Sequence, residues 1–200
     1  MRILRGIFAL FVTVAAAVPL AAEETPPSVG RDAVAPEKSR AEQLDDLFAT
    51  LQAASTSDEA AKTAESEILH LWLRSGSDTV DVLMLWAMRA MDAKMYADAL
   101  DLLDRIVTMK PDYVEGWNKR ATVYYLTDDY SKSLADIERT LAIEPRHFGA
   151  LSGLGMIMRD IGDDKRAAEA FRRALAVDPH LDNVKKSLDE LETKASGSPI

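Results

Sequence analysis

The stretch VEGWNKRATVYYLTDDYSKSLADIERTLAIEPRH, residues 114–147, decides the fold. It aligns without a gap with residues 80–113 before it and residues 148–181 after it, so one pattern recurs every 34 residues. Near its end each copy carries an apolar residue, a polar residue and a proline: Met109-Lys110-Pro111, Ile143-Glu144-Pro145 and Val177-Asp178-Pro179. A period of this length is typical of stacked helical hairpins. The sequence therefore predicts an all-α array of three hairpins.

Small and apolar residues recur at matching positions of the three copies. The eighth position is small in every copy: Ala87, Ala121 and Gly155. A small side chain there lets the two helices of a hairpin approach closely. In the second half of each copy apolar residues follow helical spacing, as Leu103, Ile106 and Val107 do in the first. Each hairpin should therefore carry an apolar stripe that only a neighbouring hairpin can cover.

The pattern resembles the tetratricopeptide repeat (TPR), whose consensus places Trp, Leu, Gly, Tyr, Ala, Phe, Ala and Pro in these columns. Residues 114–147 match best, although Arg120 departs from the consensus Leu. The matching residues are Trp117, Ala121, Tyr124, Tyr130, Leu134, Ile137, Leu141 and Pro145. The resemblance covers about half of the chain. It implies a right-handed α-solenoid of antiparallel helical hairpins, with residues 80–113, 114–147 and 148–181 as its three repeats.

Upstream, residues 41–79 are interpreted as a degenerate helical hairpin. Apolar residues lie at helical spacing in two stretches: Leu44, Leu47, Phe48 and Leu51, and then Ala61, Ala64, Ile68, Leu69, Trp72 and Leu73. Thr56 and Glu59 have the spacing of a capping box before the second stretch, and Gly76 can end it. We therefore expect this hairpin to begin the array and to close its N-terminal end.

Downstream, residues 182–195 are predicted to form a capping helix. Asp182 can cap its first turn, and Val184, Leu188 and Leu191 lie on one face. The remaining residues are mostly charged and can face water. Residues 196–200 are predicted to be a tail.

The N-terminus predicts export. Residues 1–22 have the pattern of a secretory signal peptide, since Arg2 and Arg5 precede an apolar stretch at residues 7–18. This stretch is short for a membrane-spanning helix, which favours cleavage; an uncleaved N-terminal anchor is the alternative. Residues 23–40 contain several prolines and few large apolar side chains, so they are predicted to be a flexible linker. These features predict a periplasmic or otherwise exported protein.

Composition limits the classes of partner. The chain has no cysteine, so it can form neither a disulfide nor a lipid anchor on cysteine. Its formal net charge is −9, and removal of Arg2 and Arg5 with the signal peptide would lower it to −11. An acidic chain without a segregated basic patch is repelled by phosphate backbones, so nucleic acid is not expected as a partner.

No set of residues has the spacing of a catalytic or metal site. The three histidines, His70, His147 and His180, do not share a helix face with other metal ligands. The acidic pairs Asp128-Asp129 and Asp163-Asp164 fall in the turns inside two hairpins, where carboxylates usually cap the next helix. The sequence therefore predicts no enzyme, no metal and no cofactor.

The resemblance implies where a partner would bind. In this family the first helices of successive hairpins line a concave groove that receives a peptide or a partner helix. The ligand-facing columns fall here on Met84, Met88, Met91, Asn118, Lys119, Thr122, Tyr125, Ser152, Met156 and Arg159. Methionine suits surfaces that fit irregular apolar partners. Methionines at helical spacing are also typical of a core, or of a patch that a neighbouring segment covers.

Family members that grip the C-terminal carboxylate of heat-shock chaperones carry Lys, Asn and Arg in particular columns of these helices. Here the same columns hold Met84, Met88, Lys119, Gly149 and Gly153. The carboxylate clamp is therefore missing.

These observations favour a non-enzymatic scaffold or adaptor of the bacterial envelope. It is expected to bind a peptide or helix of a partner protein in its groove, for complex assembly or envelope integrity. The alternative is a self-associating structural protein whose apolar patch is an interface between copies.

Overall fold

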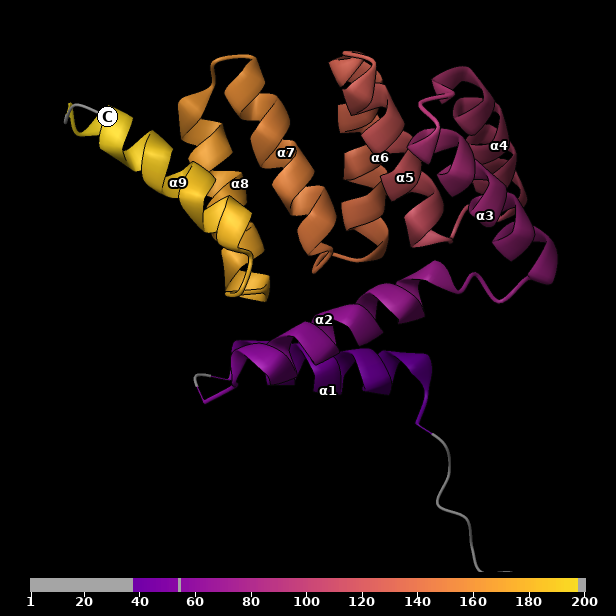
Figure 1. Cartoon of the computed structure of the whole chain (residues 1–200), viewed down its shortest axis with the longest axis horizontal. Coiled ribbons are helices and arrows are strands. Elements are labelled where there is room, and N and C mark those ends of the chain that lie inside the picture. The colour runs from indigo at the N-terminus through magenta and orange to yellow at the C-terminus, as the bar shows by residue number, and fades with distance from the viewer. Residues whose placement is uncertain (1–37, 54, 198–200) are drawn as a thin grey trace, which may run out of the picture. The chain divides into compact units, whose positions relative to one another are not determined.

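The computed structural model describes residues 38–53 and 55–197, and these residues form nine α-helices and no strand (Figure 1). The helices are α1 (Arg40–Gln52), α2 (Asp58–Leu73), α3 (Asp78–Asp92), α4 (Tyr96–Met109), α5 (Val114–Leu126), α6 (Tyr130–Ile143), α7 (Phe148–Asp160), α8 (Asp164–Val177) and α9 (Asp182–Ala195). The all-α prediction is confirmed.

Three predicted segments fall wholly or largely outside the described residues. The signal peptide at residues 1–22 lies outside them entirely, as do residues 23–37 of the linker and 198–200 of the tail. The linker was predicted to extend to residue 40, whereas α1 already begins at Arg40. Among the described helices, none is long and apolar enough to cross a membrane.

Helices α3 to α8 form three hairpins that follow one another at the 34-residue period (Figure 1). Within each hairpin the two helices pack along their length, and α4, α6 and α8 each contact the helix that follows. The small eighth residue has the predicted effect in α7, where a Cβ atom on Gly155 would lie 2.4 Å from the Phe171 ring. Only a glycine lets α7 and α8 approach this closely.

The turn inside each hairpin uses the same backbone conformation at the same period. Lys94, Asp128 and Gly162 have φ angles of 57°, 58° and 82°, in the left-handed region that favours glycine. The predicted aspartate caps of α6 and α8 stand directly after these turn residues. The Asp129 and Asp163 carboxylates accept hydrogen bonds from the amides of Lys132 at 3.3 Å and Arg166 at 3.0 Å. These acidic residues therefore satisfy free amides at helix N-termini, as predicted.

Proline ends the second helix of each of the three repeat hairpins. Helices α4, α6 and α8 stop at Met109, Ile143 and Val177, and the residue before each proline leaves the helical conformation with ψ angles of 77°, 96° and 98°. A proline disfavours the α conformation of the residue before it. The turns at Pro111–Tyr113, Pro145–His147 and Pro179–Leu181 therefore recur along one edge of the array.

The hairpin of α1 and α2 does not stack on α3 as the first member of the array. Its apolar side chains pack instead on this edge, in a cluster where Phe48 and Trp72 meet Val114 and Phe148. The Trp72 ring lies 5.2 Å from the Phe148 ring. The expectation that this hairpin closes the N-terminal end of the array is therefore wrong. The hairpin packs on the repeated turns instead, because they expose apolar side chains that it can bury.

Polar contacts join the α1–α2 hairpin to the first two turns and to the C-terminal end of α8. The Tyr113 hydroxyl donates to the Leu73 carbonyl at 2.7 Å. The Arg146 guanidinium bonds to Asp45 at 2.6 Å and lies 4.3 Å from the centre of the Phe48 ring. The Gln52 amide donates to the Ala176 carbonyl at 3.4 Å. The hairpin therefore ties the three repeats together along one edge.

The ends of three helices differ in detail from the prediction. Ser57, not Thr56, caps α2, since its hydroxyl accepts from the Ala60 amide at 3.3 Å. A capping box that the sequence analysis missed stands before α1, where Ser39 and Glu42 bond to each other's backbone amides. Asp182 is the first residue of α9 and forms no capping bond. Helix α9 packs on α8 through Val184, Leu188 and Leu191.

Candidate partner-binding groove

A cleft of about 300 Å³ lies between α5 and α7, the first helices of the second and third hairpins. Helix α6 closes its floor. It is lined by Asn118, Ala121, Thr122, Tyr125 and Leu126 of α5, Ser133 and Ile137 of α6, and Gly149, Ala150, Ser152, Gly153, Met156 and Ile157 of α7. We call this the α5–α7 cleft.

Small residues keep the α5–α7 cleft open. Gly149 and Gly153 lie one turn apart on α7, and both line the cleft. A Cβ atom on Gly153 would meet only the Cδ1 atom of Ile137, at an ordinary contact distance of 3.6 Å. A longer side chain at this position would therefore extend into the cleft, which makes Gly153 a site at which to fill it.

Tyr125 stands at one end of the cleft in a fixed position. Its hydroxyl donates to the Asp160 carboxylate at 2.9 Å, and its ring stacks on Tyr130 with the centres 5.8 Å apart. Burial and the Asp160 carboxylate raise the pKa of Tyr125 to about 12. The phenol therefore stays neutral, and its ring and Met156 both contribute apolar surface to the cleft.

A buried polar cluster supports the other end. Glu115 is 1% exposed, and its carboxylate contacts Asn118 at 3.1 Å, Lys119 at 3.6 Å and the His147 Nε2 atom at 3.1 Å. The His147 Nδ1 atom accepts from the Ala150 amide at 3.1 Å, so the Nε2 atom carries the proton and donates to Glu115. The Glu115 charge thus holds Asn118 and Lys119 at the rim.

Burial alone would raise the pKa of the Glu115 carboxyl. The hydrogen bond from His147, the charge of Lys119 and the hydrogen bond from Asn118 outweigh burial and lower this pKa to about 2. Glu115 is therefore ionised at neutral pH. The His147 ring also stacks on Trp72 of α2, with the ring centres 4.2 Å apart, so the cluster joins the cleft to the α1–α2 hairpin.

The cleft brings together five of the predicted groove residues and leaves others apart. Those that line it are Asn118, Thr122, Tyr125, Ser152 and Met156. Met84 is only 2% exposed and lies in the core of the first hairpin, so the prediction that it lies on the binding surface is wrong. Met88 and Met91 are partly buried against the same core, because the first hairpin packs these methionines inside.

The two predicted cations lie beside the cleft rather than in it. Lys119 is held by Glu115, as described above. The Arg159 guanidinium bonds to the Ser187 hydroxyl of α9 at 3.2 Å and lies 3.9 Å from Asp160. Neither cation is free of a carboxylate, so the cleft is chiefly apolar. Sequence reasoning missed the His147–Glu115 bond, because the two residues lie 32 positions apart near the starts of α7 and α5 and no sequence motif links them.

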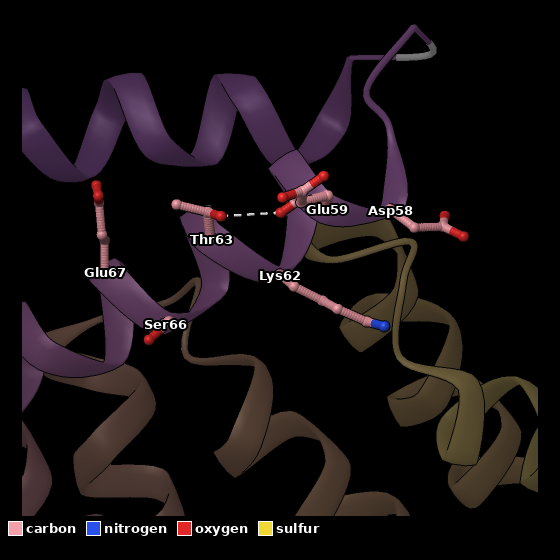
Figure 2. Close-up of a pocket in the computed structure, with 6 residues that line it drawn as sticks. All are labelled: Asp58, Glu59, Lys62, Thr63, Ser66 and Glu67. Carbon is pink, nitrogen blue, oxygen red and sulfur yellow. Dashed lines mark hydrogen bonds between the residues drawn. The ribbon is translucent and has the colours of Figure 1, made fainter.

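A larger hollow on α2 has a different character. It measures about 700 Å³ and is lined by Asp58, Glu59, Lys62, Thr63, Ser66 and Glu67 (Figure 2). All six residues are exposed, and the hydrogen bond drawn there joins the Thr63 hydroxyl to the Glu59 carbonyl within the helix. The side chains of Lys62 and Glu67 point in different directions. Nowhere in the described residues do three His, Cys, Asp or Glu side chains gather as metal ligands.

The stacked hairpins and the cleft between their first helices define a protein of the helical-repeat interaction class. No protein-family model matches the chain. A curated relative, a TPR repeat-containing protein of Rhizobium etli, is 41% identical over 157 residues, which are 78% of this chain and 76% of the relative. The chain therefore belongs to the TPR repeat-containing proteins.

Solved structures show the same fold. The Sgt2 TPR domain from Aspergillus fumigatus is 24% identical with a TM-score of 0.57, over 62% of this chain and 87% of that domain. The first TPR of Spaghetti (RPAP3), bound to the HSP90 peptide SRMEEVD, is 16% identical with a TM-score of 0.56, over 58% of this chain and 93% of that one. The TPR resemblance of the sequence is confirmed.

Proposed function

We propose that this chain is a non-catalytic scaffold that binds a peptide or helix of a partner protein in the α5–α7 cleft. The observation that carries the proposal is the cleft itself. Five residues in ligand-facing columns of the family gather around an open, mostly apolar space between two first helices. Concave apolar pockets with a few polar groups at the rim are typical binding sites.

The chemistry of the cleft favours an apolar partner segment. The solved TPR of RPAP3 binds a peptide that ends in acidic residues. In this chain the clamp columns supply a single cation, Lys119, and Glu115 already neutralises it. A partner's Leu, Met or Phe side chain would instead bury its surface against Tyr125 and Met156. Burying such a side chain fully is worth roughly 1.5–3 kcal/mol.

The hydroxyl groups at the rim can orient the partner backbone. Thr122 and Ser152 donate to carbonyls of their own helices, at 2.9 Å and 2.7 Å. Their oxygen lone pairs remain able to accept from backbone amides of a bound segment. Binding by this cleft therefore combines an apolar anchor with backbone contacts that do not depend on partner sequence.

The envelope is the proposed location. The support comes from the sequence of residues 1–22, which combines two arginines, an apolar stretch and small residues before Glu23. Assembly of envelope complexes, or maintenance of the envelope, is the proposed process. Fractionation of cells that express the full-length chain, with mass determination of its N-terminus, tests both export and cleavage; an intact N-terminus in the cytoplasm would refute the location.

Filling the cleft tests the binding proposal. A photo-crosslinking residue at Ser152 in living cells identifies the partner segment, which is then titrated as a synthetic peptide. Gly153→Ala should bind about as well as the wild type, whereas Gly153→Leu should bind at least about tenfold more weakly. Both variants should be at least as stable as the wild type, because alanine and leucine favour helix more than glycine does. Equal binding by Gly153→Leu, or a parallel loss of stability, would contradict the proposal.

A further inference from the structure

One stripe of residues recurs on α5, α7 and α9 and contacts the helix that precedes each of them. The ends of this stripe are Gly116 and Val123 on α5, Ala150 and Ile157 on α7, and Val184 and Leu191 on α9, at intervals of 34 residues. All six residues are buried. A Cβ atom on Gly116 would lie 2.9 Å from Ile106 of α4, which shows how closely the preceding helix approaches.

The equivalent stripe on α3 is uncovered, and it runs from Val82 to Arg89, which stands where the other helices carry an apolar residue. Val82 is 46% exposed and Trp86 is 51% exposed, and Leu85 beside them is 47% exposed. The reason is the position of the preceding helix, because α2 packs on the repeat turns through Trp72 rather than on α3. No described helix covers this stripe, so the array starts with an apolar face.

Two opposite charges stand at the ends of the exposed stripe. Asp78 lies in the first turn of α3 and Arg89 in its last turn, and both are exposed. Neither forms an ion pair with any residue that the structure describes. If two α3 helices pack antiparallel with Val82 opposite Leu85 of the other copy, the register also places Asp78 opposite Arg89. A two-fold axis repeats both pairs.

We propose that this stripe is an interface with a second copy of the chain, in which the two α3 helices pack antiparallel about a two-fold axis. The face buries Trp86, a residue type enriched at interface centres, and flanks it with two complementary ion pairs. Such an isologous contact closes on itself and yields a dimer. The α5–α7 cleft lies on other helices, so this inference is independent of the proposed function.

The other end of the array does not fit the exposed stripe. The outward residues of α9 include Lys185, Lys186, Asp189 and Glu190, all exposed. Head-to-tail stacking of α9 on α3 would bury these charges against Trp86 without partners, which costs free energy. The arrangement therefore favours a closed pair of α3 helices over an open chain of copies.

Light scattering and sedimentation of the protein purified from cells that express the full-length sequence test the inference. The wild type should have the mass of a dimer. Trp86→Glu should be monomeric with unchanged helical content, because about half of the Trp86 side chain is exposed in one copy. Its melting temperature should not depend on protein concentration, whereas that of the dimeric wild type should rise with concentration. A wild type that is monomeric at every soluble concentration, or a dimer that survives Trp86→Glu, would refute the interface.

Charge reversal tests the register. Asp78→Arg and Arg89→Asp each place like charges opposite one another, so each variant alone should dimerise at least about tenfold more weakly. A mixture of the two variants should form a heterodimer, because every pair in it is again opposite in sign. Failure of the mixture to restore dimers would overturn the antiparallel pairing, and a partner other than a second copy would leave all variants monomeric.

Discussion

The repeats create two surfaces, one that the chain itself covers and one that it leaves open. The edge formed by the three repeat turns is covered by the chain's own α1–α2 hairpin, whereas the α5–α7 cleft is open. On the edge, large aromatic side chains such as Trp72 and Phe148 fill the space. In the cleft, Gly149 and Gly153 have no side chains to fill the space between α5 and α7. The same repeats thus supply a fixed internal interface and an available external one, and side-chain size decides which is which.

Removing Trp72 should produce the largest effect. Its ring is fully buried between Phe48, His147 and Phe148, so Trp72→Ala should lower the free energy of unfolding by about 3–5 kcal/mol. Urea denaturation measures the loss. Trp72→Phe is the matched control, since it keeps an aromatic ring and removes an indole N–H that has no hydrogen-bond partner among the described residues; it should lose far less. Equal losses in both variants would show that ring packing does not hold the edge.

The second-largest effect is expected from acid, which should weaken the Glu115–His147 cluster that joins the edge to the cleft. The folded-state pKa of Glu115 is about 2, below its ordinary value of 4.5, so its contribution to stability is present above about pH 4.5 and is lost as the pH falls toward 2. This contribution is up to about 3 kcal/mol. Urea denaturation between pH 6 and pH 2 should therefore show a shallower pH dependence for Glu115→Gln than for the wild type. Replacement of the exposed Glu190 by Gln is the control, and its pH profile of stability should follow that of the wild type. A Glu115→Gln profile parallel to the wild-type profile would contradict the lowered pKa of Glu115.

Two glycines of α7 should respond in opposite directions to the same change. Gly155→Ala should destabilise the chain by about 1–3 kcal/mol, because the new methyl group would overlap the Phe171 ring. Gly153→Ala should stabilise it by up to about 1 kcal/mol, because the cleft has room and alanine favours helix. Thermal and urea denaturation compare the two variants. The same sign for both would show that the cleft is not open at Gly153.

The smallest effect is expected at the turns inside the hairpins, where neither surface is involved. Lys94 has a φ angle of 57°, so Lys94→Gly should raise the free energy of unfolding by about 1 kcal/mol. Gly162→Ala is the reciprocal change at the equivalent turn and should lower it by a similar amount. Differential scanning calorimetry resolves both. No shift in either variant would mean that the left-handed conformation is not maintained in solution.

The repeats were predictable because their determinants are local. Proline after α4, α6 and α8, the small residue at the eighth position, and aspartates such as Asp129 act within a few residues of their place in the sequence. The cleft was predicted in part, since Tyr125, Met156 and three polar neighbours do line it. Met84 was misplaced, because a column shared with the family does not reveal whether the first hairpin of this chain turns that side chain inward.

The sequence by itself determined that this protein is an all-α stack of three 34-residue hairpins, because periodic apolar, small and proline residues specify helices and turns over short distances. Only the tertiary structure decided that α1 and α2 lie on the turns and leave α3 exposed. Those contacts join residues far apart in the chain, such as Asp45 and Arg146, which are 101 positions apart. No local pattern encodes such a pairing, because the apolar edge on which the hairpin packs exists only where the turns of the three repeats lie together.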